Sequence, residues 1–184
     1  MNKTKLSKTV SYILRHHPED FDLKLAADAS VKTDKLLAAL QNRFQDITKV
    51  DLIQLVKNDS KGRFSFLDNK ERIRANYGHS IEGVSPDYQA VEPPEILYHG
   101  TRPEVKTKIM AAGLKPMARN YVHLSLGVKE AKKVARRRTR QPVIFKVKAL
   151  KAHHEGQDFY KTAKDIYLTD EISAIYLSLL TEND

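Results

Sequence analysis

Three runs of apolar residues at helical spacing mark the first third of the chain. An amphipathic helix repeats apolar side chains every three to four residues, and residues 6–14, 36–44 and 52–56 follow that rule. Pro18 predicts the end of the first helix, and Thr33 is a candidate cap for the second. Thr48 and Asp51 have the spacing of a capping box before the third run. The pattern therefore predicts three short helices.

The period changes to two after the turn-forming residues 58–62. Polar and apolar residues alternate over Arg63–Phe66 and again over Arg72–Arg74, which predicts a hairpin of half-buried strands. Three helices followed by a two-stranded wing are the plan of a winged-helix domain. If the apolar residues face the core, three arginines share the other face: Arg63, Arg72 and Arg74. The guanidinium fork suits phosphate oxygens, so we favour a phosphate-binding face over a merely solvated one.

Residues 81–95 have little periodicity and hold three prolines and one glycine, which predicts a linker. Beyond the linker the pattern predicts strands at 96–99, 121–125, 143–147, 166–168 and 175–177. It predicts helices at 104–112, closed by Gly113, and at 128–138. We therefore expect an α+β protein with an N-terminal lobe of residues 1–80, a linker at 81–95 and a C-terminal lobe of residues 96–184.

Composition adds a nucleic-acid partner to this picture. The chain has 184 residues and a formal net charge of +9, with arginines placed beside histidines and in alternating strands, so we favour RNA or DNA as a partner over a merely solvated surface. It has no cysteine, which excludes disulfides, thiolate nucleophiles and cysteine-rich zinc sites. No apolar run approaches the ~20 residues of a membrane span, and the first ten residues lack the apolar core of a secretion signal. We expect a soluble, cytoplasmic protein.

The candidate catalytic groups are individually common. Arg15-His16 ends the first predicted helix, where the negative end of the helix dipole favours a charged imidazole. Tyr98–Thr101 places a histidine at a strand end, followed by a glycine whose backbone can approach a ligand closely. Arg119 leads into the strand Tyr121–Ser125, whose polar residues share one face. Each alone is more often structural: a basic helix end, a turn, or a strand histidine in the core.

Several reaction classes have no support in the sequence. The chain has no P-loop and no GxGxxG motif, which argues against ATP hydrolysis and ordinary hydride transfer, and it has no HExxH motif that would suggest a zinc site held by histidines. No spaced pair of acidic residues stands out for glycoside hydrolysis or for a two-metal nuclease.

Taken together, five segments resemble the RNA 2′-phosphotransferase family, best known for tRNA splicing, in their order and spacing. The segments are Leu14–His16, Gly62–Phe64, Ile73–Ser80, Tyr98–Thr101 and Arg119–Ser125. The resemblance covers essentially the whole chain. It implies a winged-helix N-terminal lobe and an ADP-ribosyltransferase-like C-terminal lobe, with the active site between them. It also implies NAD and an RNA with an internal 2′-phosphate, such as tRNA, as substrates, with no metal, no obligatory protein partner and no membrane.

The resemblance carries residue roles with it. It implies an essential quartet of Arg15, His16, Arg63 and Arg119. It implies an NAD pocket of His99, Gly100, Thr101, His123 and Ser125. Together with the alternation of the hairpin it predicts RNA-phosphate contacts at Arg72, Arg74 and His79. Two positions depart from the family pattern and concern contacts to RNA or adenosine rather than the quartet: Tyr77 replaces an expected glutamine, and Lys164-Asp165 an Asn-Gly turn before Tyr167–Thr169.

The implied reaction has two steps. The RNA 2′-phosphate attacks the anomeric carbon of the nicotinamide ribose, and nicotinamide leaves. The ribose 2″-hydroxyl then attacks the transferred phosphorus, and His16 donates a proton to the departing RNA oxygen. Two alternatives remain: an ADP-ribosyltransferase acting on nucleic-acid phosphate ends or on protein, and a non-catalytic winged-helix RNA-binding protein.

Overall fold

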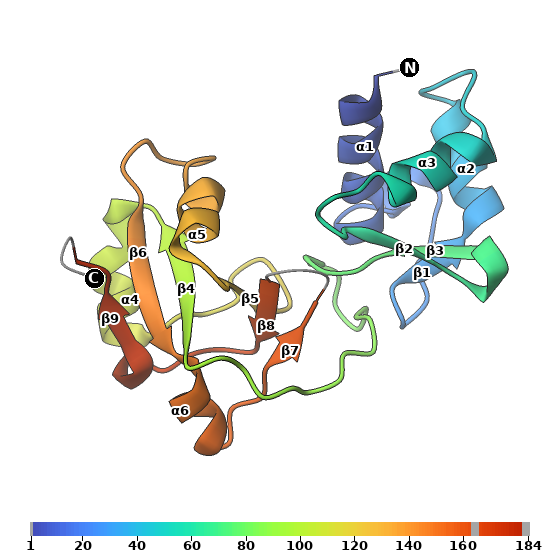
Figure 1. The fold of residues 1–184 in the computed structure, drawn as a ribbon. Coiled ribbons are helices and arrows are strands. Elements are labelled where there is room, and N and C mark those ends of the chain that lie inside the picture. Colours follow the sequence, from blue (N-terminus) through green and yellow to red (C-terminus); the bar gives the residue numbers. More distant parts are fainter. Residues whose placement is uncertain (1, 163–165, 182–184) are drawn as a thin grey trace. The chain divides into compact units, whose positions relative to one another are not determined.

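The computed structural model describes residues 2–162 and 166–181. The chain divides into two compact units, Met1–Asp87 and Tyr88–Asp184. Both contain helices and an antiparallel sheet, so the protein is of the α+β class (Figure 1).

The N-terminal unit combines three α-helices with a small sheet (Figure 1). Its helices are α1 (Lys3–Arg15), α2 (Thr33–Gln41) and α3 (Lys49–Lys57). Its strands are β1 (Ser30–Lys32), β2 (Phe64–Leu67) and β3 (Arg72–Ala75), and single 3₁₀ turns lie at Glu19–Phe21 and Asp68–Lys70. The sheet order is β1-β3-β2, and both pairings are antiparallel. The three predicted helices and the predicted hairpin are confirmed.

Of the two helix caps predicted from local sequence signals, one is confirmed and the other is wrong. The capping box before α3 is confirmed, because the Thr48 side chain accepts from the amide of Asp51 and the Asp51 carboxylate accepts from the amide of Thr48. The cap predicted for α2 is wrong. Thr33 is the first helical residue, Lys32 is the N-cap, and the Thr33 hydroxyl donates to the Lys70 carbonyl at 2.9 Å. Thr33 is fully buried and connects the helix start to the hairpin turn.

The C-terminal unit is built on a six-stranded antiparallel sheet in the order β7-β8-β5-β4-β6-β9. The strands are β4 (Ile96–Thr101), β5 (Val122–Ser125), β6 (Val143–Lys148), β7 (Tyr160–Lys161), β8 (Ile166–Thr169) and β9 (Leu177–Leu179). Its helices are α4 (Lys106–Ala112), α5 (Val128–Ala135) and α6 (Ala149–His154), with 3₁₀ turns at Pro103–Val105 and Ala174–Tyr176. The strands predicted up to residue 168 are confirmed, and α5 is three residues shorter than predicted. Strand β9 begins where the predicted 175–177 strand ends.

Each face of this sheet is covered by different elements. Leu97, Phe145 and Val147 point to one face and form its main core with residues of α6 and of the segments around α4. Successive strand residues alternate, so Gly100 points to the other face. Helix α5 lies there, across β4 and β6 (Figure 1). The residues predicted to bind NAD therefore belong to strands that are packed on both sides.

The predicted linker does not stand apart from the two units. Val84 packs against the core of the first unit, and the Ser85 amide donates to the Ala27 carbonyl at 2.9 Å. Val91 packs in the second unit, and its amide donates to the Phe159 carbonyl at 2.8 Å. Residues 81–95 are thus shared between the units, with the boundary after Asp87.

No helix within residues 2–162 and 166–181 has the length and apolar character needed to cross a membrane.

Candidate active-site residues in the two units

One short segment, residues 76–80, connects the end of α1 to the turn before β2. The Ser80 amide donates to the Arg15 carbonyl at 3.0 Å, and the Ser80 hydroxyl shares a 2.9 Å hydrogen bond with Nδ1 of His16. At its other end, the first residue of the segment donates its amide to the Arg63 carbonyl at 2.8 Å. Three of the four predicted essential residues, the neighbours Arg15 and His16 and the sequence-distant Arg63, therefore lie against the same segment.

The Tyr77 ring contacts Arg15 and lies within reach of the Arg63 charge. The Arg15 guanidinium is 4.8 Å from the centre of the Tyr77 ring, a cation–π contact, and the Tyr77 hydroxyl donates to the Lys61 carbonyl at 3.1 Å. Burial raises the pKa of Tyr77, while the charges of Arg15 and Arg63 act in the opposite direction. Both guanidinium groups are thus within electrostatic reach of one ring. The tyrosine that departs from the family pattern has a defined place: it positions Arg15.

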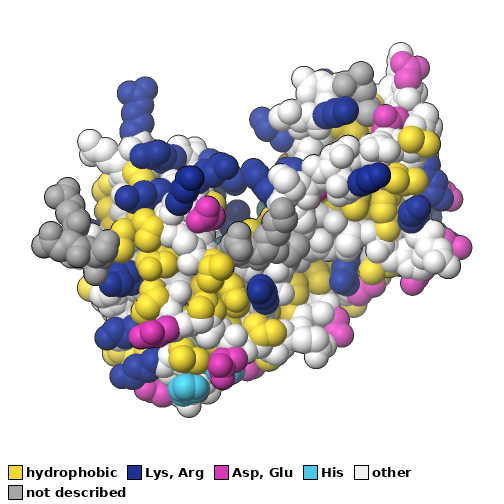
Figure 2. Space-filling model, viewed as in Figure 1, with side chains coloured by type: hydrophobic (Ala, Val, Ile, Leu, Met, Phe, Trp, Pro, Cys, Tyr) yellow, Lys and Arg dark blue, Asp and Glu magenta, His cyan; other side chains and the backbone are white. Residues whose placement is uncertain are grey.

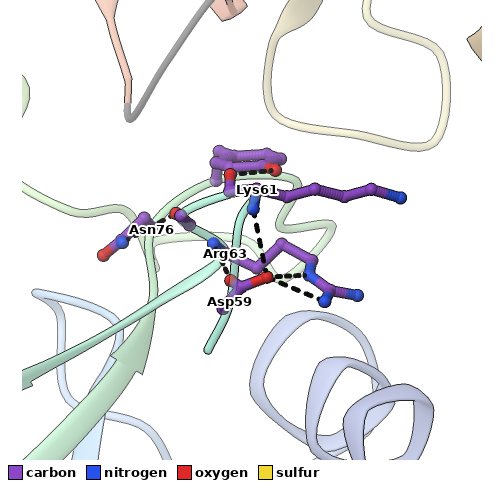
Figure 3. A network of polar contacts seen from close by, with 6 residues as sticks. Asp59, Lys61, Arg63 and Asn76 are labelled. Carbon is purple, nitrogen blue, oxygen red and sulfur yellow. Dashed lines mark hydrogen bonds and ion pairs between the residues drawn. The ribbon is translucent and has the colours of Figure 1, made fainter. Parts of the chain in front are cut away.

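A buried carboxylate holds Arg63. Nε and Nη2 of Arg63 both bind Oδ1 of Asp59, at 2.9 and 2.8 Å, and the Arg63 amide donates to Oδ2. Burial raises the pKa of Asp59, but the hydrogen bonds and charge of Arg63 outweigh it and hold that pKa below its usual value. Figure 3 shows the consequence: two guanidinium nitrogens face Asp59, and the third points away. Nη1 makes no hydrogen bond within the described part of the chain, so it can donate to an anion.

His79 is buried near Arg15, the arginine that contacts Tyr77. Its side chain is 3% exposed, and desolvation, together with the charges of Arg15, His16 and Arg74, lowers its pKa from 6.5 to about 4. The imidazole is therefore neutral at pH 7. The predicted contact of His79 with an RNA phosphate stays a prediction, and a neutral ring would serve it through a hydrogen bond rather than through charge.

Arg72 and Arg74 are tied to the β1 side of the small sheet. Nε of Arg72 donates to the Ser30 hydroxyl at 2.7 Å, and Nη2 to the Ser30 carbonyl at 3.3 Å. Nη1 of Arg74 donates to the Asp28 carbonyl at 3.5 Å, and both guanidinium charges help to lower the pKa of Asp28, after the Ser30 hydrogen bond. Both side chains are partly exposed. Their contact with RNA phosphate stays a prediction.

In the C-terminal unit, two histidines have their ring orientation fixed by carbonyl groups. Nδ1 of His99 lies 3.1 Å from the His123 carbonyl, and Nδ1 of His123 lies 3.0 Å from the Tyr121 carbonyl. A carbonyl oxygen only accepts, so each Nδ1 carries the hydrogen, and Nε2 of the neutral ring is an acceptor. Burial lowers the pKa of His99, and the nearby Arg119 charge lowers it further against the opposing effect of the His123 carbonyl. His99 is therefore a neutral acceptor for a hydroxyl group.

Arg119 is exposed in the turn before β5, and its effect on His99 shows that its charge lies near that ring. The other predicted NAD residues lie at strand ends. Ser125 ends β5 opposite Tyr98, and Thr101 ends β4 opposite Val143. The structure thus brings Arg119, His99 and His123 together and spreads the hydroxyl groups along β4 and β5.

Gly100 has a packing role that the sequence pattern did not indicate. A Cβ at this position would lie inside contact distance of the Ala131 carbonyl of α5 and 3.0 Å from Cβ of Ala135. The glycine therefore lets α5 approach β4, whereas the sequence had suggested close approach of a ligand. A role in binding NAD stays a prediction for its backbone.

The sequence pattern missed a cluster of tyrosines. The rings of Tyr88, Tyr121 and Tyr160 contact one another in pairs, with centroids 5.6 to 5.9 Å apart. Tyr121 follows Arg119 by two residues, but Tyr88 belongs to the predicted linker and Tyr160 to β7, a strand without periodicity. The cluster fixes the start of β5, and so the strand that carries His123.

Among the described residues, one group of side chains is spaced closely enough to hold a metal ion. His17, Glu19 and Asp20 each offer an atom within 4.8 Å of the others, and all three are exposed. These atoms already have protein partners, because Glu19 pairs with His17 at 3.2 Å and Asp20 accepts from the Tyr12 hydroxyl at 2.6 Å. The group does not include any residue of the predicted site.

Comparison with known proteins decides the family. The profile described as "RNA 2'-phosphotransferase, Tpt1 / KptA family" matches residues 1–171. The chain belongs to the RNA 2′-phosphotransferase family. A probable RNA 2′-phosphotransferase of Rhizobium leguminosarum bv. trifolii is 42% identical over 176 residues, 96% of this chain and 94% of the relative. A relative of the same name from Trichormus variabilis is 40% identical, and the match covers 97% of this chain and 97% of the relative. Another from Bacillus thuringiensis subsp. konkukian is 39% identical, and the match covers 97% of this chain and 98% of the relative.

Membership of the RNA 2′-phosphotransferase family agrees with the resemblance drawn from the five segments. The last family segment, Tyr167–Thr169, lies on β8 and pairs with β5, where Leu168 is opposite His123. Thr169 is buried, and its hydroxyl accepts from Nε2 of the Gln157 side chain at 2.8 Å. The departure at Lys164-Asp165 lies outside the described residues.

Proposed function

We propose that the protein removes an internal 2′-phosphate from RNA by transferring it to the ADP-ribose part of NAD. Family membership supports the phosphotransferase activity. The observation that carries the proposal beyond the family is the grouping of Arg15, His16 and Arg63 against residues 76–80. Two guanidinium groups and an imidazole provide donors and positive charge suited to a phosphate dianion.

The first proposed step forms a bond between a 2′-phosphate oxygen and C1″ of the nicotinamide ribose. The glycosidic bond breaks, its electron pair leaves with nicotinamide, and nicotinamide departs as a neutral molecule. A phosphate monoester has a second pKa of ~6, so it is already largely a dianion at neutral pH and needs no general base. Arg63, with Nη1 turned away from Asp59, has a donor for this phosphate that costs it no internal hydrogen bond.

The second proposed step moves the phosphorus from RNA to the ribose. The 2″-hydroxyl oxygen attacks phosphorus and gives up its proton to water, the bond from phosphorus to the RNA 2′-oxygen breaks, and that oxygen takes up a proton. His16 is the donor that we assign, because Nδ1 is held by Ser80 and the opposite edge of the ring carries the second nitrogen. The products are 2′-hydroxyl RNA and ADP-ribose 1″,2″-cyclic phosphate.

The C-terminal unit supplies groups that suit NAD. His99 is neutral and has an acceptor at Nε2, which makes no hydrogen bond within the described residues and suits a ribose hydroxyl. Arg119 carries an exposed positive charge near that ring, which suits a diphosphate. We therefore propose an ADP-ribosyltransferase-like NAD-binding lobe here. The three helices and small sheet of the first unit support a winged-helix RNA-binding lobe.

The role of His16 tests the two-step scheme. A departing RNA alkoxide needs a proton, whereas nicotinamide does not, and positioned acid catalysis is typically worth ~10²–10⁴-fold. His16→Ala should therefore slow the second step more than the first, so that ADP-ribosylated RNA accumulates. Gel separation of labelled RNA during a single turnover with NAD would show the intermediate as a retarded band, which wild-type protein would not accumulate.

His17→Ala is the matched control, because His17 is the exposed neighbour of His16. It should leave the time course unchanged. Loss of nicotinamide release in His16→Ala, with no retarded band, would contradict the assignment of His16 to the second step. A retarded band as the end product of the wild type would instead favour an ADP-ribosyltransferase that stops after the first step.

A further inference from the structure

The largest concentration of charge in the chain lies outside the proposed catalytic residues. Residues 128–140 contain seven lysines and arginines and one glutamate, a net charge of +6 within a chain of +9. The basic residues are Lys129, Lys132, Lys133, Arg136, Arg137, Arg138 and Arg140, and all seven are exposed. Figure 2 shows this basic side-chain cluster over α5 and the loop that follows it. We call these seven residues the α5 basic surface.

The cations on the helix form one stripe. Lys129, Lys132, Lys133 and Arg136 are spaced at i, i+3, i+4 and i+7, so they share a face of α5 and its last turn. The side turned to the sheet is small and apolar: Ala131 and Ala135 are 1% and 4% exposed and pack over Gly100. One side of the helix thus belongs to the fold, and the exposed side presents the cationic stripe, with Glu130 and Val134 also exposed on the helix.

Within the described residues these cations have no ion-pair partner. None of the seven forms an ion pair with any residue in 2–162 or 166–181. Like charges at i+3 and i+4 spacing repel one another and destabilise a helix modestly. A bound polyanion would relieve this repulsion and release its own counterions.

The cationic stripe lies close to β4, the strand that we propose to hold NAD. Helix α5 crosses β4 at Gly100, between His99 and Thr101. The loop after α5 enters the sheet at Val143, directly opposite Thr101. Since an α-helix is about 10–12 Å across, the outer cations lie within roughly one helix diameter of the strand proposed to hold NAD.

We propose that the α5 basic surface binds the phosphate backbone of the RNA strand that flanks the reacting nucleotide. The inference rests on the proposed function, which requires RNA to approach NAD. The contacts would be independent of base sequence, because lysine and arginine here meet phosphates and no aromatic or amide side chain accompanies them on the stripe. An anionic membrane surface fits less well, since an interfacial helix needs an exposed apolar face, whereas Ala131 and Ala135 are buried and α5 exposes only the single large apolar side chain of Val134.

The test compares two triple variants of the full chain with equal loss of charge. K129Q/K132Q/K133Q removes the lysines of the stripe, and glutamine has nearly the same helix propensity as lysine. K106Q/K108Q/K148Q is the control in the same unit, on α4 and at the end of β6, where the lysines are also exposed. Circular dichroism and thermal melts check that both variants fold as the wild type does.

The first measurement is binding of an unphosphorylated 20-nucleotide RNA over a range of salt concentrations. Loss of three phosphate contacts should make the slope of the log association constant against log salt less negative by about 2 for single-stranded RNA. By the same relation, the Kd at 0.1 M salt should rise on the order of 10- to 100-fold. The control triple should change the Kd by less than about 3-fold. Equal losses in the two triples, or no loss in either, would overturn the proposal.

The second measurement separates this proposal from the proposed function. With NAD present, the stripe variant should lose kcat/KM on a 2′-phosphorylated 20-mer but keep it on a 2′-phosphorylated dinucleotide, which has no flanking strand for the α5 basic surface to bind. Equal loss on both substrates would overturn the proposal. If the wild type turns over neither substrate, the proposed function fails, while the salt dependence still decides whether α5 binds RNA.

Discussion

Buried His79 should make the folded state sensitive to pH between about 4 and 6.5. Its imidazole is 3% exposed, and its Nε2 has no hydrogen-bond partner among the described residues. Burial, and then the charges of Arg15, His16 and Arg74, lower the pKa from 6.5 to about 4. In the unfolded chain the ring titrates near its ordinary value of about 6.5.

The sign of the effect follows from these two values. Between pH 6.5 and 4 the unfolded chain binds a proton at this ring and the folded protein does not, so the free energy of unfolding falls as the pH falls. A shift of one pKa unit corresponds to about 1.4 kcal/mol. Going from pH 7.5 to 5 should therefore cost about 2 kcal/mol at this one site, and the loss should approach about 3 kcal/mol below pH 4.

Two assays check the prediction. Urea unfolding at pH 7.5 and 5.0 should show a pH-dependent loss that is about 2 kcal/mol smaller in His79→Gln than in the wild type. His154→Gln, at an exposed histidine of α6, should keep the full wild-type loss. An NMR titration of the His79 ring in the wild type should show no protonation down to about pH 5. A midpoint near 6.5, or an unchanged pH-dependent loss in His79→Gln, would refute the argument.

Two further substitutions test single contacts. Gly100→Ala should destabilise the protein by roughly 1–3 kcal/mol, because the new Cβ collides with the Ala131 carbonyl; an unchanged Tm would contradict the packing role. Arg63→Lys should lower turnover at least about 10-fold with NAD affinity unchanged, since an ammonium cannot bind Asp59 through two nitrogens and direct a third donor at phosphate. Steady-state kinetics would measure the effect, the exposed Arg43→Lys is the control, and equal activity of the two variants would contradict it.

The features that followed from the sequence are those set by neighbours in the chain. The capping box of Thr48 and Asp51 spans three residues, and the helices and hairpin follow from periods of 3.6 and 2. Strand β1, three residues long, is too short to show a period, and it exists because β3 pairs with it. Strand β9 starts later than predicted because it is defined by its pairing with β6. A 3₁₀ turn occupies the preceding residues, where the sequence predicted the start of a strand.

The candidate site also has features that the sequence predicted and features that depend on residues distant in the sequence. The five segments identified its residues, but not how they are held. The hydrogen bond of His16 with Ser80 joins residues 64 positions apart, which no local pattern indicates. The reason for Gly100 lies in a helix that starts 28 residues later. The Asp59 clamp on Arg63 spans only four residues, and the acidic residue within the turn-forming segment 58–62 was a signal that could have predicted it.

The fate of the phosphate tests the central claim most directly. An RNA oligonucleotide with one radiolabelled internal 2′-phosphate would be incubated with the protein, with and without NAD, and the products separated by chromatography. We predict that the label leaves RNA only when NAD is present and appears in ADP-ribose 1″,2″-cyclic phosphate, with one nicotinamide released for each 2′-hydroxyl formed. Label released as inorganic phosphate, or lost from RNA without NAD, would contradict the account.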